Sequence, residues 1–480
     1  MNQVRQDLLR SLPSVTALLE EEEVRDWLHG LPRPAVVGAL QRAVDMARDG
    51  ILSGVIHESV DRQEILAKAE MDLLHRSRPS LRRVINATGI VLHTGLGRAP
   101  LCEAAIEAIV ESVGGYCNLE YDLHTGQRGR RTAHVVEKLI QLTGAESATV
   151  VNNNAAATLL ILQTFAAGRE VIVSRGQLVE IGGSFRLPEI LRAGGATLRE
   201  VGTTNRTRLA DYEEAVTDAT GLLLRVQPSN YRIVGFTESV AMGEISALAH
   251  RFGLLAVEDL GSGLLVNLAA HGLPPEPTVR ASLAAGADIV CCSGDKLLGG
   301  PQCGLILGKQ PLIERLESSP LMRAYRVGKL TLMALEATLG AYLAPETSMS
   351  TIPALAMLAA STDALAGRAR TVVERLEAAA PGEHFYVCSD VSYAGGGSMP
   401  DTGLETVVVQ WRPRIATLDS AAAALRDGDV PVIARIHDGA ICFDLRTVFE
   451  SDLDDLVASV SAVIWDLQQS DERGISLPIL

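Results

Sequence analysis

The sequence predicts an α/β protein in three parts: a helical N-terminal domain over residues 1–80, a large α/β domain with a mostly parallel sheet over residues 81–344, and a small α+β C-terminal domain over residues 345–480. The N-terminal part carries apolar residues at helical spacing and no strand-like alternation. Downstream, short runs rich in Val, Ile and Leu alternate with helical stretches and glycine-rich turns. This pattern is typical of parallel sheets with crossover helices.

Apolar spacing and prolines define the helices expected in the N-terminal domain. Leu8 and Leu12 begin one apolar stripe, and residues 31–34 interrupt the helical pattern because they contain two prolines. A last helix is expected over residues 61–75. Pro79 closes it, since the residue before a proline avoids helical geometry.

Strands and helices are expected in turn through the rest of the chain. In the large domain, the stretches that carry strands are residues 147–166, 169–177, 195–205, 220–230, 253–263 and 286–296. In the C-terminal domain, strands are expected over residues 406–411, 430–436 and 440–446, with helices near 419–426 and over 451–467. The glycine run at 395–397 is expected to be a flexible connection.

Composition places the chain among ordinary globular proteins. Its 480 residues are 47% hydrophobic and 21% charged, which excludes wholesale disorder and allows at least one large core. The formal net charge of −15 argues against a general polyanion binder, because non-specific nucleic-acid affinity comes from Lys and Arg. We therefore expect no DNA partner.

Nothing in the sequence predicts export or membrane insertion. The first residues lack the apolar core of a signal peptide, and no apolar run reaches the ~18 residues of a membrane span. We expect a cytoplasmic protein with no membrane partner. The seven cysteines are thinly spread and form no C-x-x-C pair, so reduced thiols are expected rather than a disulfide framework or a metal site.

A first candidate for ligand binding follows an apolar strand that ends near Val151. Asn152, Asn153 and Asn154 lead directly into an alanine-rich helix. A helix N-terminus offers unpaired backbone N–H groups and the positive end of the dipole, which together suit a phosphate. An asparagine that simply caps a helix explains the same pattern, so both interpretations stay open.

A second candidate is the acid pair at the end of the strand in residues 253–263. Glu258 and Asp259 precede a glycine-rich turn, and ligands of open α/β folds sit at the carboxyl ends of the strands. Because side chains alternate along a strand, one acid should face the crevice and the other should face away. Either acid, taken alone, is equally well explained as a helix cap or a surface charge.

The third candidate is Lys296, which follows a buried strand and lies in a loop of serine and glycine. A lone lysine is usually a solvated surface charge, but the apolar run and the glycines around this one indicate a crevice. A partly desolvated lysine has a lowered pKa and can form a Schiff base.

Together, these three segments predict a site for pyridoxal 5′-phosphate. A helix N-terminus would anchor the phosphate, a carboxylate would keep the pyridine nitrogen protonated, and a lysine would hold the aldehyde and then move the proton. The expected architecture of the large domain is therefore fold type I of pyridoxal-phosphate enzymes, the aspartate-aminotransferase-like fold.

Several longer segments carry a more specific resemblance. They are residues 83–100, 118–131, 182–188, 200–206 and 443–448, together with 258–263 and 293–296. These strings resemble bacterial selenocysteine synthase, the L-seryl-tRNA(Sec) selenium transferase family, over most of the chain. A string of this length matches by chance far less often than a short glycine motif does.

The resemblance implies a role for each cofactor-binding candidate. Lys296 is similar to the lysine that binds pyridoxal phosphate, and Asp259 resembles the acid that faces the pyridinium nitrogen. Asn153, Asn154 and Ser293 stand where phosphate contacts are expected.

The resemblance also implies catalytic roles. Asp295 resembles an acid needed for the elimination step, and Arg98, Arg323 and Arg326 resemble the arginines that receive the oxyanion of the selenium donor. Arg323 and Arg326 lie at i, i+3, hence on one face of a helix, and guanidinium groups suit phosphate or selenophosphate. Without the resemblance, a solvated basic face is the better explanation of their spacing.

The activity implied is conversion of L-seryl-tRNA(Sec) to L-selenocysteinyl-tRNA(Sec), with selenophosphate as selenium donor and an aminoacrylate intermediate on the cofactor. Residues 1–80 would bind the tRNA, although acidic residues slightly outnumber basic ones there. A homo-oligomer, a pentamer of dimers with active sites at subunit interfaces, is also implied. A serine esterified to tRNA has no free carboxylate, so an arginine that clamps a carboxylate would have nothing to bind. Arg435 is the position that tests this point.

Two alternatives remain open on the sequence. One is a related pyridoxal-phosphate lyase or transferase that acts on a small free amino compound, such as an amino-sugar phosphate. Such relatives are expected to lack the N-terminal domain. The other is a tRNA-binding protein with an inactive core, against which the Asp259–Lys296 pair argues.

Overall fold

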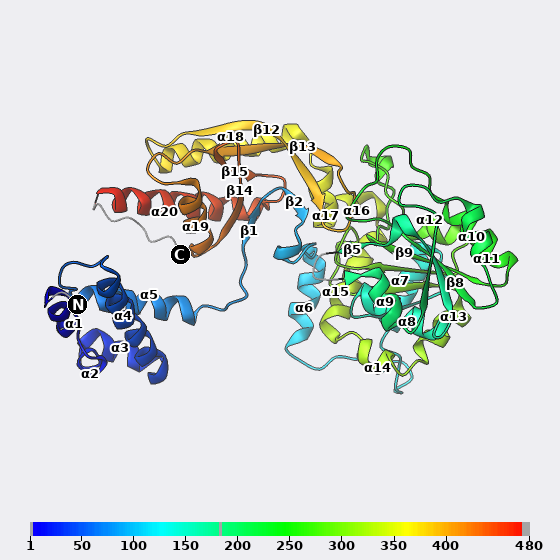
Figure 1. Ribbon diagram of the computed structural model, residues 1–480, viewed down its shortest axis with the longest axis horizontal. Helices are drawn as coiled ribbons and strands as arrows, with labels where there is room; N and C mark the ends of the chain where they lie inside the picture. Colours follow the sequence, from blue (N-terminus) through cyan, green and yellow to red (C-terminus); the bar gives the residue numbers. More distant parts are fainter. Residues whose placement is uncertain (1–2, 182–184, 473–480) are drawn as a thin grey trace. The chain divides into compact units, whose positions relative to one another are not determined.

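The computed structural model describes residues 3–181 and 185–472, and the chain divides into two compact units, Met1–Arg83 and Val84–Leu480 (Figure 1). Residues 182–184, which belong to one of the segments that carry the resemblance, lie outside the described residues. In the described part of the chain, no helix is both long enough and apolar enough to cross a membrane.

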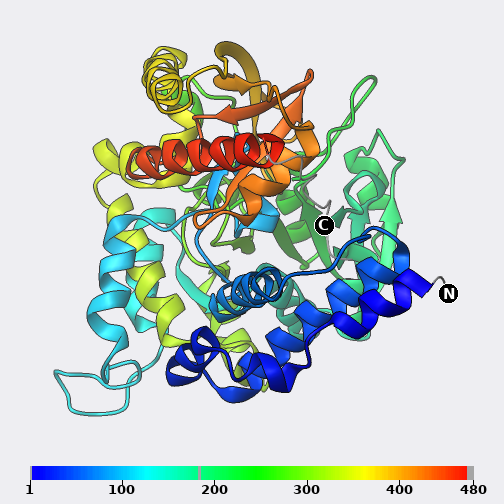
Figure 2. The same ribbon diagram turned by 90° about the vertical axis from the view of Figure 1, so that its left-hand side faces the viewer.

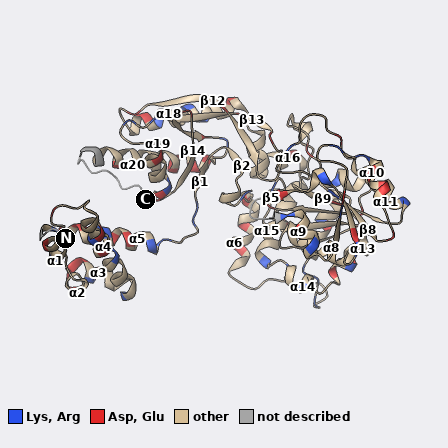
Figure 3. Cartoon of the chain, viewed as in Figure 1, with Lys and Arg blue, Asp and Glu red and all other residues tan. Residues whose placement is uncertain are grey.

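The first unit is entirely helical over its described residues. Its helices are α1 (Gln3–Ser11), α2 (Val15–Leu18), α3 (Glu22–Gly30), α4 (Arg33–Ser53) and α5 (Arg62–Ser77). Leu40 and Ile65 are fully buried in its apolar core, and Arg42 joins α4 to α5 through an Nε–Oδ2 distance of 3.1 Å to Asp72. Basic and acidic residues are interspersed along the helices of this unit (Figure 3). The unit therefore has its own core and carries charges of both signs along its chain.

The second unit contains a seven-stranded sheet in the order β3-β11-β10-β9-β8-β4-β7. The strands are β3 (Ser147–Val151), β4 (Glu170–Ser174), β7 (Thr197–Val201), β8 (Thr220–Val226), β9 (Leu255–Gly261), β10 (Ile289–Ser293) and β11 (Gly304–Gly308). Neighbouring strands are parallel except at β11, which runs antiparallel to both β10 and β3. The sheet is thus mostly parallel, as the sequence predicts. A small hairpin, β5 (Glu180–Ile181) with β6 (Phe185–Arg186), stands apart from it.

Helices cover both faces of this sheet because its strands are apolar on both sides. Ile172 of β4 packs with one group of helices, whereas its neighbours Val171 and Val173 pack with the other, as strand alternation requires. The helices of this region are α6 (Glu103–Val113), α7 (Ala133–Thr143), α8 (Asn154–Phe165), α9 (Leu187–Ala193), α10 (Leu209–Ala215), α11 (Met242–Arg251), α12 (Val279–Ala284), α13 (Gln310–Glu317), α14 (Met322–Tyr325) and α15 (Lys329–Tyr342). The architecture is a layered α/β fold whose strand ends are available for a site.

A second, six-stranded sheet has the order β1-β14-β15-β13-β12-β2. Its strands are β1 (Ile85–Ala87), β2 (Ile90–Leu92), β12 (Phe385–Gly395), β13 (Gly403–Trp411), β14 (Val432–His437) and β15 (Ala440–Asp444). Strands β1 and β2 lie within residues 81–344, yet they pair with β14 and β12 of the C-terminal part. This sheet is therefore built from both ends of the second unit.

Helices pack on this sheet through a separate apolar core that includes Phe443, Trp411 and Val460. The helices after α15 are α16 (Pro345–Thr351), α17 (Pro353–Ala359), α18 (Thr362–Ala379), α19 (Leu418–Asp427) and α20 (Leu453–Glu472). Figure 2 shows α20 lying across the strands of the C-terminal sheet. The strands and helices predicted for residues 406–467 are present.

Candidate active site

The predicted site residues follow strands that are neighbours in the large sheet. Asp259 of β9 lies beside Val226 of β8 on one side and Cys291 of β10 on the other. A cavity of about 260 Å³ opens at these strand ends. The predicted residues that line this lysine cavity are Arg98, Asn153, Asn154, Asp259, Ser293, Asp295 and Lys296. Residues from distant parts of the chain thus share one cavity.

Lys296 is almost fully buried at the base of the loop that follows β10. Burial lowers the pKa of its ammonium group, while the nearby Asp259 carboxylate acts in the opposite direction. Gly397, from the connection between β12 and β13, has a φ of +88°, and a Cβ there would collide with Nζ of Lys296. The glycine run predicted as a flexible connection is therefore a close cover for the lysine.

Asp259 is held by hydrogen bonds from two side chains of α8. Asn154 Nδ2 donates to Oδ1 over 2.8 Å, and Thr158 Oγ1 donates to Oδ2 over 3.3 Å. Burial raises the pKa of Asp259, and these hydrogen bonds and the charge of Lys296 lower it. Glu258, the other acid of the pair, instead forms an ion pair with Arg225. The two acids therefore point in different directions, as strand alternation predicts.

The two asparagines at the start of α8 each make a hydrogen bond within the protein and also line the lysine cavity. Asn153 is the N-cap, and its side chain accepts a hydrogen bond of 2.8 Å from the backbone of Ala156. Asn154 uses its amide nitrogen on Asp259, but its Oδ1 is buried with no partner among the described residues. Both asparagines and Ala155 line the lysine cavity, so the first turn of α8 faces it. Capping and ligand binding are compatible here.

Arg98 and Asp295 form a pair beside Lys296. Arg98 Nη1 lies 2.6 Å from Asp295 Oδ2, and Asp295 is nearly buried. Arg98 has a φ of +62°, a left-handed conformation that costs a non-glycine residue about 1–2 kcal/mol. Its Nε is buried and has no partner within the described residues. A strained arginine with an unused donor therefore lines the lysine cavity.

Arg323 and Arg326 line a different cavity of about 710 Å³, here called the arginine cavity. Helix α14 contains Arg323 and ends at Tyr325, so Arg326 is its C-cap residue. The arginine cavity also contains Arg128, Arg130 and Arg131, which pair with Glu120 and Glu317. Arg323 has no ion pair in the part of the chain that the structure describes, and Arg326 lies 3.8 Å from Glu120. Within one chain, Arg98 and the other two predicted arginines do not share a cavity.

Three residues of the site were missed by the sequence analysis. Thr158 holds Asp259, Gln227 lines the lysine cavity directly after β8, and Glu276 interacts electrostatically with Lys296. The signal for Gln227 was present, because it is the first polar residue after a buried strand, as Asn152 is after β3. Glu276 follows two prolines in a loop and gives no such signal.

Arg435 of β14 is occupied by two carboxylates. Its Nη2 lies 2.9 Å from Asp390 and 3.4 Å from Asp444. A guanidinium paired in this way is not available to clamp the carboxylate of a free amino acid.

Known protein families match most of this chain, including the residues of the lysine cavity. Residues 84–449 match the family model of L-seryl-tRNA selenium transferase, and residues 9–48 match that of the selenocysteine synthase N-terminal region. The chain belongs to the L-seryl-tRNA selenium transferase family. Proteins named L-seryl-tRNA(Sec) selenium transferase are similar to it. The one from Desulfomicrobium baculatum is 46% identical over 95% of this chain and 99% of its own length. The one from Solidesulfovibrio magneticus is 48% identical over 95% and 98%.

A solved structure supports the fold class of this family member. The structure of D-glucosaminate-6-phosphate ammonia-lyase superposes with a TM-score of 0.56 at 21% identity, and it covers 81% of this chain and 97% of the other. The fold is that of the aspartate-aminotransferase-like enzymes, with a helical N-terminal region, and pyridoxal 5′-phosphate is the cofactor. Both expectations from the sequence are confirmed.

The lysine cavity of this family member fits that cofactor. A buried lysine, a buried carboxylate and a helix N-terminus face the same space. Two buried polar atoms that lack partners among the described residues, Asn154 Oδ1 and Arg98 Nε, belong to residues lining it. Unsatisfied buried groups of this kind are expected where a polar ligand binds.

Proposed function

We infer that this chain converts L-seryl-tRNA(Sec) to L-selenocysteinyl-tRNA(Sec), with selenophosphate as the selenium donor. The observation that carries this function is a family match over residues 84–449 that contains an intact cavity with Lys296 and Asp259. The chain is a pyridoxal-phosphate-dependent transferase. The inactive-core alternative is disfavoured, because both residues that the cofactor chemistry needs are present and buried together.

The residues that would hold the cofactor follow from the cavity. Lys296 would bind its aldehyde, Asp259 would face its ring nitrogen, and the first turn of α8 with Ser293 would receive its phosphate. When bound, the cofactor supplies an electron sink for the bond that breaks at Cα of the seryl group. Asn153 supports the phosphate as the cap of α8, and Asn154 supports the ring by holding Asp259.

Proton movement falls to Lys296 in this proposal. Because burial lowers its pKa, the amine is more readily neutral, and a neutral Nζ can accept the Cα proton and return it. The serine hydroxyl leaves Cβ as water, and that departure needs a proton. We assign its delivery to the Lys296 ammonium that forms when Nζ takes the Cα proton. Asp295, which is paired with Arg98 beside Lys296, would orient that ammonium. Selenium of the selenophosphate would then form a bond to Cβ, and the proton that the donor carries would pass through Lys296 to Cα. Water would cleave the P–Se bond and release inorganic phosphate.

Arg98 is the residue of the lysine cavity that suits the anionic selenium donor. Its guanidinium is paired with Asp295. The Arg98 side chain is about a third exposed, and its Nε has no partner among the described residues. Arg323 and Arg326 would complete the oxyanion site if the arginine cavity of one copy served the lysine cavity of another. This arrangement requires a homo-oligomer, and we propose the pentamer of dimers that the family resemblance implies. Light scattering on the purified protein measures the size directly.

The lysine cavity suits a serine that is esterified to tRNA. Its carboxyl is bound to the tRNA, so no carboxylate clamp is needed, and Arg435 is already committed to Asp390 and Asp444. We assign tRNA binding to residues 1–80, supported by the match of residues 9–48 to the N-terminal family model. Affinity for tRNA(Sec) after deletion of residues 1–75 tests this assignment, and unchanged affinity would contradict it.

We propose a cytoplasmic location. All seven cysteines lie in the described part of the chain and are unpaired, and five of them are buried: Cys102, Cys291, Cys292, Cys303 and Cys442. Cell fractionation followed by immunoblotting tests the location.

One assay tests the function as a whole. Purified protein with cofactor, seryl-tRNA(Sec) and selenophosphate should form selenocysteinyl-tRNA(Sec), and Lys296→Ala should not. Free serine should be a poor substrate, because Arg435, the candidate clamp for its carboxylate, is already paired with Asp390 and Asp444. Turnover of free serine with no reaction on seryl-tRNA(Sec) would favour the small-substrate alternative.

A further inference from the structure

A third cavity, here called the side cavity, adjoins the lysine cavity. It has a volume of about 640 Å³ and shares Gln227 with the lysine cavity. Glu276, on one wall of the side cavity, interacts electrostatically with Lys296. The side cavity therefore lies next to the space in front of Lys296.

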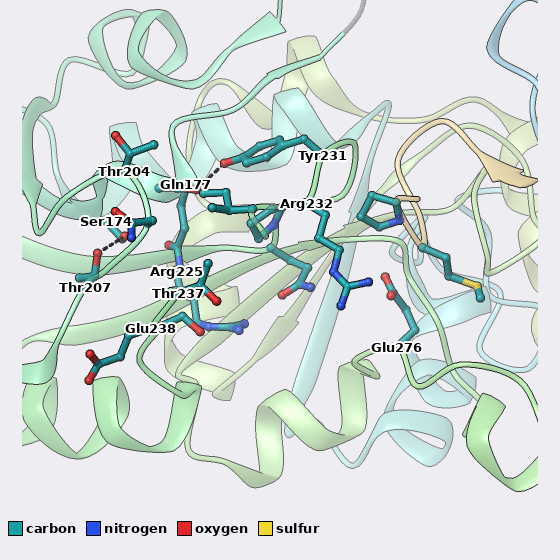
Figure 4. A pocket seen from close by; sticks show the side chains of 18 of the residues that line it. Ser174, Gln177, Thr204, Thr207, Arg225, Tyr231, Arg232, Thr237, Glu238 and Glu276 are labelled. Carbon is teal, nitrogen blue, oxygen red and sulfur yellow. Dashed lines mark hydrogen bonds between the residues drawn. The ribbon is translucent and has the colours of Figure 1, made fainter. Parts of the chain in front are cut away.

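The side cavity has an available positive charge. Arg225 also lines it but is committed to Glu258. Arg232 is exposed and has no ion pair among the residues that the structure describes. In Figure 4, the Arg232 side chain extends into the cavity toward Glu276. The unpaired guanidinium is the feature of this cavity that calls for an anionic partner.

A partly buried aromatic ring lies next to that arginine. Tyr231 lines the side cavity, and its hydroxyl donates to the backbone oxygen of Gly176, which fixes the ring at the wall (Figure 4). Farther along the wall, the hydroxyls of Ser174 and Thr207 are 2.7 Å apart. An aromatic face beside a guanidinium and hydroxyl groups is the combination that binds single-stranded nucleotides.

We propose that the side cavity binds the 3′-terminal nucleotide of the tRNA acceptor strand, with its phosphate on Arg232 and its base against Tyr231. This inference rests on the proposed function. The seryl group is esterified to the terminal ribose, so when Cα lies at Lys296 the ribose must occupy adjoining space. The side cavity supplies that space, and its volume lies within the usual range for small-ligand sites.

Glu276 modulates this site. Burial raises its pKa to about 7, while a hydrogen bond from the backbone of Met399 and the charge of Lys296 lower it. Arg232 also lines this cavity (Figure 4). Glu238, also on the cavity wall, is paired with Arg208. The charge of Glu276 opposes a phosphate, so affinity for the nucleotide should increase as this carboxyl becomes protonated.

The test combines a protein variant with a shortened RNA. Affinities for uncharged tRNA(Sec) and for the same tRNA lacking its 3′-terminal nucleotide are measured by filter binding on the full-length holoenzyme. Arg232→Ala should weaken binding of the intact tRNA about three- to tenfold and leave the shortened tRNA unaffected. It should also reduce the slope of log K against log salt by about 0.7, the value for one single-stranded phosphate. Arg232→Lys should keep most of that slope.

Arg199→Ala is the matched control, since Arg199 is exposed on β7 and does not line the cavity. It should affect neither RNA. The inference is overturned if Arg232→Ala weakens both RNAs equally, if it behaves like Arg199→Ala, or if the wild type binds both RNAs alike. Selenium transfer is measured in the same preparation. If selenium transfer occurs but the effect of Arg232→Ala does not depend on the 3′-terminal nucleotide, only the role of the side cavity is refuted. If the tRNA binds but no selenium is transferred, both the proposed function and the role of the side cavity are refuted.

Discussion

Replacing Asn154 with alanine removes a hydrogen bond from the buried carboxylate of Asp259. The two atoms lie 2.8 Å apart, and a bond to a charged group contributes about 1.5–3 kcal/mol. Because the bond favours the ionised form, its loss should raise the pKa of Asp259 further, in the same direction as the increase that burial already causes. Only the ionised carboxylate holds the protonated ring nitrogen of the cofactor. Cofactor affinity should therefore fall about 10- to 100-fold.

The direction of the pH effect follows from the same cause. A higher pKa leaves more of the carboxyl protonated as the pH falls, so the loss of affinity in Asn154→Ala should grow at acid pH and shrink at alkaline pH. Cofactor titrations followed by visible absorbance at several pH values measure this. Asn152→Ala is the control, because Asn152 belongs to the same turn but is exposed. An Asn154→Ala protein with wild-type affinity at every pH, or an equal loss in Asn152→Ala, would refute the reasoning.

Three further predictions concern other parts of the site. Gly397→Ala should weaken cofactor binding in absorbance titrations, because its Cβ would collide with Lys296. Gly382→Ala has a similar positive φ and open space around it, so it should bind cofactor normally. If the lysine cavity of one copy meets the arginine cavity of another, co-expression of Lys296→Ala with Arg326→Ala subunits should restore the selenium transfer that neither variant shows alone. No recovery would mean that Lys296 and Arg326 do not act together across copies. Glu276→Gln should abolish the rise in tRNA affinity of the wild type as the pH falls through about 7, measured by filter binding, and an unchanged pH profile would exclude Glu276 as its source.

The chemistry of the site was largely predictable from local sequence. A buried strand followed by polar residues defines a strand end, and parallel strands place such ends at one edge. Lys296 could be predicted on that basis. Strand alternation indicated that only one of Glu258 and Asp259 faces the cavity, and the family resemblance identified it as Asp259. The family resemblance added Arg98 and Asp295, which the structure then joins at 2.6 Å.

Other features depended on contacts between distant segments. The sequence predicts no strand over residues 85–92, where β1 and β2 join the C-terminal sheet, because an extended segment of three residues carries little pattern and can pair with any available edge. The glycine run at 395–397 indicated only a flexible connection, although Gly397 covers Lys296. Arg323 and Arg326 had the predicted spacing, but the short helix α14 directs them into a cavity without Arg98.

The sequence by itself therefore determined the fold class and the cofactor, and it predicted Lys296 and Asp259 as the residues that hold that cofactor, because strand ends, helix starts and the lysine loop are local patterns. Only the tertiary structure decided how Asn154 and Thr158 hold Asp259, how Gln227 joins the lysine cavity to the side cavity, and where Glu276 lies. These residues are far apart along the chain. The order of the strands brings them together, and that order is set by the packing of the whole sheet.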